Sequence, residues 1–277
     1  MFEKIAKVAK NKNIKMLIFG YAGVGKTMFS LSQPGEGYMI NFENGIVQYA
    51  DLFPNLQVTT ISKWQQFVDA IDNIANNAKP NSFLVIDSET AYWDQMLYDR
   101  SEYERNGIRD VNVPNFADWG VLKKIDANIH QKIKNLNMNV VAIAHEKPVV
   151  NSSEYVSGYV PACNKALPYM FDVTVRMTKD FDGTRKLFVE NRHGNWLMKD
   201  VYDVTNKTFY DIFKDELGLV SDMDSMLQFT KIKISFCKVP EDVKTLFESF
   251  VQSFPEITPE IKDELKEYAK MQLKKLV

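Results

Sequence analysis

The hydrophobic positions of this chain fall into short unbroken runs separated by stretches with helical periodicity. Runs of this kind, without polar alternation, are typical of strands that are covered on both faces, as in a parallel sheet. They occur at residues 16–19, 37–42, 82–87 and 139–145. Apolar residues recur at helical spacing at 64–78 and 118–136. This order predicts an α/β domain with a mostly parallel sheet and helices on both faces.

Two further strands are expected at 171–177 and 185–191. Only residues 178–184, "TKDFDGT", separate these two strands, and Asp182-Gly183 within that segment is a turn signal. The pattern therefore predicts an antiparallel hairpin that extends the parallel sheet.

The pattern changes after Val220. Apolar residues between 243 and 254 follow helical spacing, and Thr258-Pro259 then supplies an N-cap residue and a proline at the first helical position. We therefore predict a core domain at 1–220 and a small helical appendage at 221–277. The apolar face of the appendage either packs on the core or binds a partner protein.

Composition narrows the class. With 277 residues, 45% hydrophobic and 25% charged, the chain can bury a full core. No apolar run approaches the roughly 18 residues of a membrane span, and the basic N-terminus lacks the apolar centre of a signal peptide. We expect a cytoplasmic protein with no membrane partner. Cys163 and Cys237 show no metal-ligand spacing and are expected to be reduced thiols.

One segment carries a specific chemical signal. Residues 20–27, "GYAGVGKT", fit G-x-x-x-x-G-K-[ST], between a predicted strand and a predicted helix. In such a loop the backbone amides surround phosphates, the lysine reaches the β- and γ-phosphates, and the hydroxyl of the last residue binds Mg²⁺. We predict a site for ATP and Mg²⁺. The expected nucleotide-binding residues are Gly20, Ala22, Gly23, Val24, Gly25, Lys26, Thr27 and Met28.

Polar residues follow three of the other predicted strands. Asp87 ends a strand and is a candidate to hold Mg²⁺ opposite Thr27. Glu43 follows the second strand, at the edge where ligands bind in open α/β sheets, and is a candidate general base. Glu89 is a less favoured alternative for that role. His145 ends the fourth strand, where an imidazole can contact the γ-phosphate.

The order of these parts, together with "NKALPYMFDVTVRM" and "VENRHGN", resembles the RecA-type ATPase core over about residues 14 to 200. Within that class the chain is similar to phage-encoded RecA-like ATPases of recombination and single-strand annealing. The resemblance implies that Asp87 serves the metal, that Glu43 is the base and that His145 is the γ-phosphate sensor, where RecA has glutamine. It also implies that Arg192, or Lys165, reaches the γ-phosphate of a neighbouring subunit.

The resemblance further implies DNA contacts at 99–117 and 146–163. These stretches contain cations and rings that can grip phosphates and stack on bases, namely Arg100, Arg105, Arg109, Lys147, Tyr155 and Tyr159. They also contain acidic residues, namely Glu102, Glu104, Asp110, Glu146 and Glu154. The net charge of −2 does not indicate nucleic-acid binding, so such binding depends on local patches, and solvated loops are the alternative.

The leading hypothesis is an ATPase that acts on single-stranded DNA in annealing or strand exchange, in the host cytoplasm if the chain is phage-encoded. Its expected partners are single-stranded DNA, further copies of itself in a ring or filament, and a single-strand DNA-binding protein. One alternative is a ring-forming replicative helicase motor. Another is a nucleotide-switched module that recruits a partner protein through the C-terminal helices.

Overall fold

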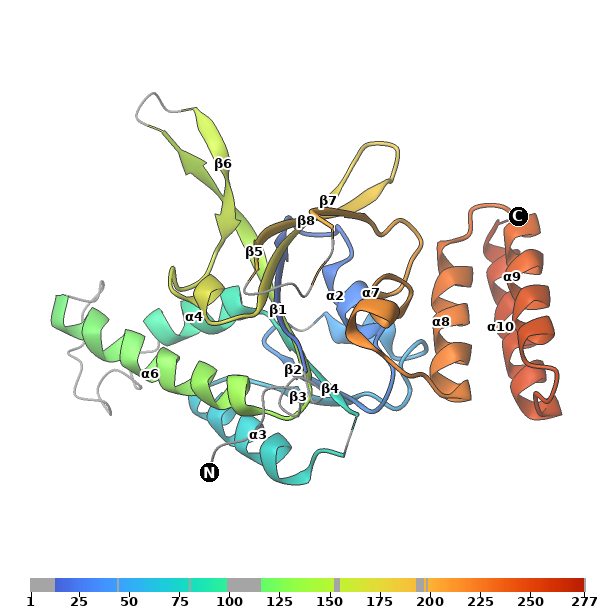
Figure 1. Cartoon of the computed structure of the whole chain (residues 1–277), viewed down its shortest axis with the longest axis horizontal. Coiled ribbons are helices and arrows are strands. Elements are labelled where there is room, and N and C mark those ends of the chain that lie inside the picture. Colours follow the sequence, from blue (N-terminus) through green and yellow to red (C-terminus); the bar gives the residue numbers. More distant parts are fainter. Residues whose placement is uncertain are drawn as a thin grey trace.

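The structure is a computed structural model that describes residues 13–43, 45–79, 81–98, 116–151, 155–192, 197 and 199–276 (Figure 1). Its strands form one sheet with two hairpin extensions. The strands are β1 (Lys15–Gly20), β2 (Gly37–Asn41), β3 (Gln57–Thr60), β4 (Phe83–Asp87), β5 (Asn139–Val150), β6 (Val156–Pro161), β7 (Val173–Lys179), β8 (Arg185–Arg192) and β9 (Val201–Asp203).

The sheet has the order β3-β2-β4-β5-β1-β7-β8-β9, and β6 pairs with the far half of β5. The pairs from β3 to β7 are parallel, whereas β7 with β8 and β8 with β9 are antiparallel. The carboxyl ends of β1, β2 and β4 therefore lie at one edge, which we call the phosphate edge. The predicted mostly parallel sheet and the predicted β7–β8 hairpin are both confirmed.

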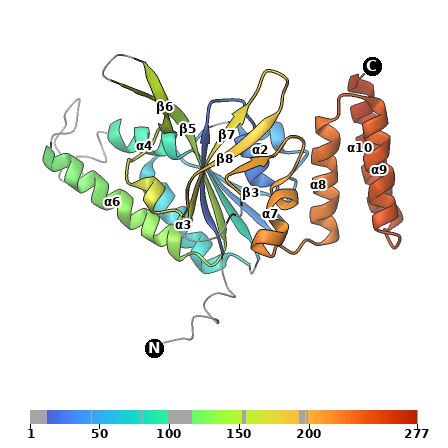
Figure 2. The ribbon, with the colours of Figure 1, turned by 45° about the horizontal axis from the view of Figure 1, so that its top comes forward.

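Helices cover both faces of the sheet (Figures 1 and 2). One face packs against α3, α4 and α6, and the other against α2, α7 and α8. The helices are α2 (Lys26–Leu31), α3 (Trp64–Asn77), α4 (Glu89–Tyr98), α6 (Phe116–Asn135), α7 (Phe209–Leu217), α8 (Met223–Phe236), α9 (Pro240–Ser253) and α10 (Pro259–Leu276). Two short 3₁₀ turns are η1 (Ile46–Tyr49) and η2 (Leu167–Tyr169).

The unbroken apolar runs are explained by these two layers. Along β1, Leu17 and Phe19 enter the core beneath α3, α4 and α6, while Met16 and Ile18 enter the core beneath α2 and α7. Because successive side chains on a strand point to opposite faces, a strand covered on both sides needs apolar residues at every position.

The C-terminal helices pack on the core through α8. Phe229 and Ile232 of α8 join the core beneath α2 and α7, whereas Leu227 and Ile234 join a separate cluster with α9 and α10. Figure 2 shows α9 and α10 on the outer side of α8. The boundary between residues 220 and 221 stays a prediction. Of the helices that the structure describes, none is long and apolar enough to cross a membrane.

One local prediction was wrong. The segment 146–163, expected as a loop, is largely a β-hairpin, in which β5 continues to Val150 and pairs with β6. Its DNA contacts stay a prediction. We call this hairpin the arm, and it projects away from the sheet (Figures 1 and 2). Its β-branched valines favour extended backbone. The edge strand β3 was not predicted either, because all four of its residues are exposed and give no apolar signal.

Candidate nucleotide-binding site

The loop between β1 and α2 has the backbone that its glycines permit. A Cβ atom at Gly20 would lie 2.2 Å from the carbonyl oxygen of Met177 on the neighbouring strand, so no side chain fits there. Gly25 is the N-cap of α2 with φ of 102°, a left-handed conformation that other residues rarely adopt. The first backbone bond of the helix runs from the amide of Phe29 to the carbonyl of Gly25, so the preceding amides have no partner within the helix.

Lys26 lies inside the curve of this loop. Its Nζ donates hydrogen bonds to the carbonyls of Gly20 (2.8 Å) and Tyr21 (2.9 Å), and the residue is only 7% exposed. Burial lowers the pKa of Lys26, while the charges of Asp87 and Glu43 raise it. The loop thus holds a desolvated cation at the position where the template requires one.

Thr27 and Asp87 meet at the phosphate edge. Thr27 Oγ1 donates to Asp87 Oδ2 over 2.7 Å. Neighbouring oxygens in a Mg²⁺ octahedron with bonds of 2.0–2.1 Å are about 2.9 Å apart, so these two oxygens are spaced as adjacent ligands or as a ligand and its bonded neighbour. Burial raises the pKa of Asp87, although the bond from Thr27 lowers it. The two residues fit a Mg²⁺ ion.

The described residues contain no group of three or more His, Cys, Asp and Glu side chains that could hold a metal.

Glu43 and His145 form a pair beside the lysine. His145 Nε2 lies 3.1 Å from Glu43 Oε1, and the hydroxyl of Ser88 donates to the same carboxylate. His145 is opposite Gly20 in the β1–β5 register, and its amide donates to the hydroxyl of Thr90 (2.8 Å). The hydrogen bond to His145 lowers the pKa of Glu43, and the same bond raises the pKa of His145.

These groups surround a cavity of about 260 Å³. Five of the predicted nucleotide residues line it, namely Ala22, Gly23, Gly25, Lys26 and Thr27, and so do Glu43, Asp87 and His145. The other three predicted residues do not line it. Gly20 packs against the backbone of Met177 at the start of the loop, and Val24 is fully buried. Met28 lines a separate small cavity with Arg185 and Phe236.

Sequence reasoning missed three contacts of the loop. Gln48 and Tyr49 line the cavity from η1, and Tyr49 is hydrogen-bonded to Thr27. Their place just after Glu43 was the available signal. Burial raises the pKa of the Tyr49 hydroxyl, although the bond with Thr27 lowers it. Arg185, at the start of β8, donates from Nε to the carbonyl of Val24 (3.0 Å), which braces the loop from a strand 161 residues away.

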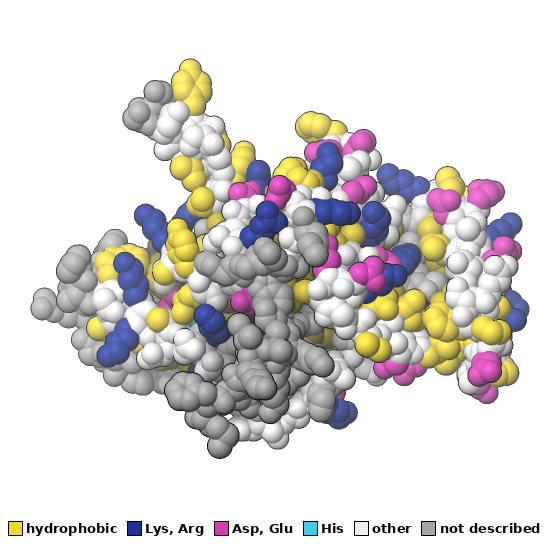
Figure 3. All heavy atoms as spheres, in the orientation of Figure 1, with side chains coloured by type: hydrophobic (Ala, Val, Ile, Leu, Met, Phe, Trp, Pro, Cys, Tyr) yellow, Lys and Arg dark blue, Asp and Glu magenta, His cyan; other side chains and the backbone are white. Residues whose placement is uncertain are grey.

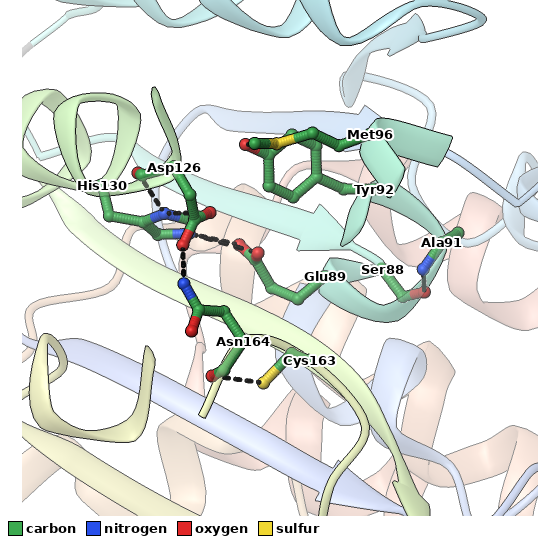
Figure 4. A network of polar contacts seen from close by, with 9 residues as sticks. All are labelled: Ser88, Glu89, Ala91, Tyr92, Met96, Asp126, His130, Cys163 and Asn164. Atoms are coloured by element: carbon green, nitrogen blue, oxygen red, sulfur yellow. Dashed lines mark hydrogen bonds and ion pairs between the residues drawn. The ribbon is translucent and has the colours of Figure 1, made fainter. Parts of the chain in front are cut away.

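Glu89, the alternative base, does not line this cavity, and its carboxylate points toward His130 (Figure 4). Its carboxylate oxygens lie 3.2 and 3.1 Å from Nε2 of His130, whose Nδ1 is 3.1 Å from Asp126 Oδ1. Asn164 Nδ2 donates to the other oxygen of Asp126. Burial lowers the pKa of His130, but the two carboxylates outweigh it and hold that pKa well above its usual value. Glu89 is only 1% exposed and contacts His130 in the core, so the structure favours Glu43 over Glu89 as the candidate base.

Arg192 lies far from the phosphate loop of its own chain. It pairs with Val173 in the β7–β8 register, and Val173 is beside Met16, at the start of β1. That is the sheet edge opposite the phosphate edge. Its guanidinium contacts Asp200 (2.7 Å) and the carbonyl of Leu197 (3.0 Å). Lys165 is exposed beside the base of the arm. Among the predicted DNA contacts, Arg100, Arg105 and Arg109 lie outside the described residues, as does Gly194 beside Arg192.

A parallel sheet with a glycine loop, an enclosed lysine and a threonine–aspartate pair at its carboxyl edge defines a P-loop NTPase of the ATPase type. The chain belongs to the AAA domain family, whose model matches residues 12–200. The match spans the core and ends before the C-terminal helices. No curated protein matches this chain.

The Glu43–His145 pair predicts a pH dependence of ATP turnover. Because the pKa of His145 is raised above its usual value of 6.5, the imidazole stays protonated at pH 6.5 and somewhat above. Because the pKa of Glu43 is lowered, its carboxylate stays ionised to a pH below 4.5. The pair is therefore intact on the acid side of neutral pH and is lost as pH rises through the pKa of His145. Turnover should fall about 3- to 10-fold there, because a charged donor binds phosphate more strongly than a neutral one.

The comparison enzyme is His145→Gln, which donates a hydrogen bond without a titrating proton. Its pH profile should lack the alkaline fall. Identical profiles of kcat for the two proteins between pH 5.5 and 9 would show that His145 does not act on the reacting phosphate.

Proposed function

We propose that this chain hydrolyses ATP to control its binding to single-stranded DNA. The process that this binding serves is phage-type recombination, by annealing or strand exchange. One observation carries the proposal: a single strand, β5, contributes both His145 to the nucleotide cavity and Lys147 to the arm. His145 is two residues from Lys147 on the same strand. A change in the hydrogen bonds of His145 can therefore alter the position of the exposed cations and aromatic rings of the arm.

The geometry supports the hydrolytic roles that we propose. Glu43 accepts hydrogen bonds at the phosphate edge and is placed to take a proton from an attacking water. Lys26 neutralises charge on the β- and γ-phosphates, and Thr27 with Asp87 holds Mg²⁺. When bound with ATP, Mg²⁺ stabilises the charge that develops on the transferred phosphoryl group.

The arm has the side chains that single-stranded DNA requires. Lys147 is exposed, and the ring of Tyr155 (74% exposed) is available for stacking on bases, whereas Tyr159 can offer only the ring face that Arg176 does not cover. Figure 3 shows hydrophobic side chains along the arm and cations near its base. Glu146, one of the acidic residues that opposed a DNA role, is paired with Arg176 (2.9 Å), so its charge is compensated. The same guanidinium lies 4.1 Å from the Tyr159 ring centroid.

Binding of single-stranded DNA should weaken steeply with salt, and Lys147→Ala should reduce the salt slope by about one phosphate contact. Tyr155→Ala should weaken binding about 5- to 100-fold with little change in the slope, because a lost stacking contact is worth about 1 to 3 kcal/mol. Fluorescence anisotropy with ATP and Mg²⁺ at several salt concentrations measures both. Lys244→Ala, on the exposed face of α9, is the control. Binding that is insensitive to salt or to these substitutions would remove the arm from the DNA site.

We further propose that the active site is completed across a subunit boundary. Arg192 cannot serve its own phosphate loop, because it lies at the opposite sheet edge, but that edge can face the loop of a neighbour. An arginine supplied in trans contributes about 10³-fold or more to phosphoryl transfer. Lys165 is the second candidate for this role.

Mixing two inactive variants tests this arrangement. Lys26→Ala and Arg192→Ala should each lose ATP turnover, and their mixture should partly regain it, since some sites then combine an intact loop with an intact arginine. The control mixture pairs Lys26→Ala with Glu43→Gln, which disable the same subunit's site and should not complement in this way. Failure of the first mixture, with both variants still assembling with wild type, would assign Arg192 to its pair with Asp200.

Two other functions remain as outcomes of these experiments. Unwinding of a forked duplex, driven by ATP, would identify the replicative helicase alternative. ATP turnover that ignores DNA would favour the nucleotide-switched module, for which α9 and α10 offer a surface on the far side of the molecule from the arm (Figure 1).

A further inference from the structure

The turn between β7 and β8 presents one aromatic side chain entirely to solvent. Phe181 is fully exposed, and Asp180 and Asp182 flank it. The turn is held by backbone bonds from Asp180 to the carbonyl of Thr184 (2.8 Å) and from Gly183 to the carbonyl of Asp180 (3.0 Å). Asp182 also accepts from the amide of Thr184 (2.8 Å). A large ring on a well-bonded turn loses little entropy on binding, as an interface anchor requires.

A groove of complementary character lies at the base of the arm. It has a volume of about 610 Å³ and runs between the arm, η2 and the ends of β7 and β8 that lie away from Phe181. Its walls are mostly apolar or aromatic, and its charged residues are Lys147, Lys165 and Glu190. The apolar walls include Val149, Tyr159, Val160, Pro168 and Tyr169. At the tip, Asp180 is paired with Lys186 (3.3 Å), which leaves Asp182 beside the ring. An aromatic ring beside a carboxylate thus matches an apolar groove in which the lysines outnumber the single glutamate.

Phe181 does not lie in the groove of its own chain, because its ring is fully exposed. The groove reaches Thr174 and Asn191, which pair near the start of the β7–β8 hairpin, whereas Phe181 is beyond the Lys179–Arg185 pair at its other end. Seven residues of extended strand separate Phe181 from that end of the groove by about 20 Å. Both surfaces are therefore free to meet between two molecules.

We propose that Phe181 of one copy of this chain docks in the groove at the base of the arm of a second copy, with Asp182 facing Lys165. The contact uses two different surfaces, so it is head-to-tail and builds a ring or a filament. It rests on the proposed function only in assuming that the chain assembles with itself.

The contact also links assembly to the nucleotide site. The β7–β8 hairpin is bonded to the phosphate loop, since the Tyr21 hydroxyl donates to the carbonyl of Lys179 (2.6 Å) and Arg185 donates to that of Val24. A neighbour seated on the tip therefore brings its Lys165 to the edge of the sheet that carries this loop. This is a structural route by which a cation from the next subunit approaches the phosphates.

The first test measures self-association by sedimentation velocity with Mg²⁺ and a non-hydrolysable ATP analogue, without DNA. Phe181→Ala should weaken association by about 30-fold or more, the usual effect of losing an aromatic anchor. Val160→Asp, which places a carboxylate in the groove, should do the same. The matched control is Val220→Ala, which also removes an exposed apolar side chain (86% exposed) but lies outside both surfaces. Unchanged melting temperatures establish that the variants are folded.

The second test mixes the two variants. Phe181→Ala retains an intact groove and Val160→Asp an intact tip, so together they can make one contact and should form a dimer that does not grow. Larger assemblies, or none, would overturn the inference, as would a wild type that stays monomeric over the whole concentration range. If Phe181→Ala associates normally but binds single-stranded DNA less well, the tip contacts bases instead and the inference is wrong. Because neither hydrolysis nor DNA enters the mass measurement, its result is independent of the proposed DNA function.

Discussion

Lys26→Ala should lower ATP turnover by about 10²- to 10³-fold, a loss of about 3 to 4 kcal/mol of transition-state stabilisation. The side chain is buried inside the loop with two carbonyl partners, and no other cation lines the cavity formed by the described residues apart from His145. Without the ammonium, charge that moves onto the β- and γ-phosphates is uncompensated in a partly desolvated site. The steady-state rate of phosphate release measures the effect.

Stability is the necessary control for this variant. Lys26→Ala leaves the carbonyls of Gly20 and Tyr21 without this donor, so its melting temperature must be compared with that of the wild type. Lys244→Ala, an exposed lysine on α9, should hydrolyse ATP at the wild-type rate. Wild-type turnover by folded Lys26→Ala would contradict the assignment of the phosphate loop.

Glu43→Gln should bind ATP and Mg²⁺ at the wild-type affinity but turn over about 10²- to 10⁴-fold more slowly. An amide oxygen can still accept hydrogen bonds from Ser88 and His145, so the cavity keeps its shape, but an amide cannot accept the proton of the attacking water. Binding measured by calorimetry and turnover measured in a single cycle separate the two effects.

Glu89→Gln is the matched comparison for the base. It removes a carboxylate that contacts His130 in the core, so it should reduce stability while a folded fraction keeps its turnover. If instead Glu43→Gln turns over normally and folded Glu89→Gln does not, the general base is Glu89 and our reading of its orientation is wrong.

The parts of the fold that the sequence could predict are those with a local signal. The strand, glycine loop and helix from 15 to 31 are set by short-range chemistry, and buried runs such as 83–87 are typical of strands covered on both sides. Glu43, Asp87 and His145 could be placed together because parallel strands end at one edge. The ends of these strands bring all three to a single cavity.

The remaining contacts depend on tertiary structure. Arg185 braces the phosphate loop across 161 residues of chain, and no local pattern marks it. Glu89 is two residues from Asp87, yet α4 begins at Glu89 and directs that side chain into the core toward His130. For Arg192 the decisive fact is strand direction: an antiparallel β8 ends at the edge away from the loop. The short motif around Arg192 does not indicate at which edge of the sheet β8 ends.

The central claim is that ATP hydrolysis at this loop is coupled to single-stranded DNA at the arm. The most direct test is ATP turnover by the wild type with and without single-stranded DNA, with Lys26→Ala as the blank for contaminating activity. We predict slow turnover alone, an increase of about tenfold or more with DNA through completion of sites between subunits, and none above background in the blank. Turnover that is the same with and without DNA, or that persists in the blank, would contradict the account.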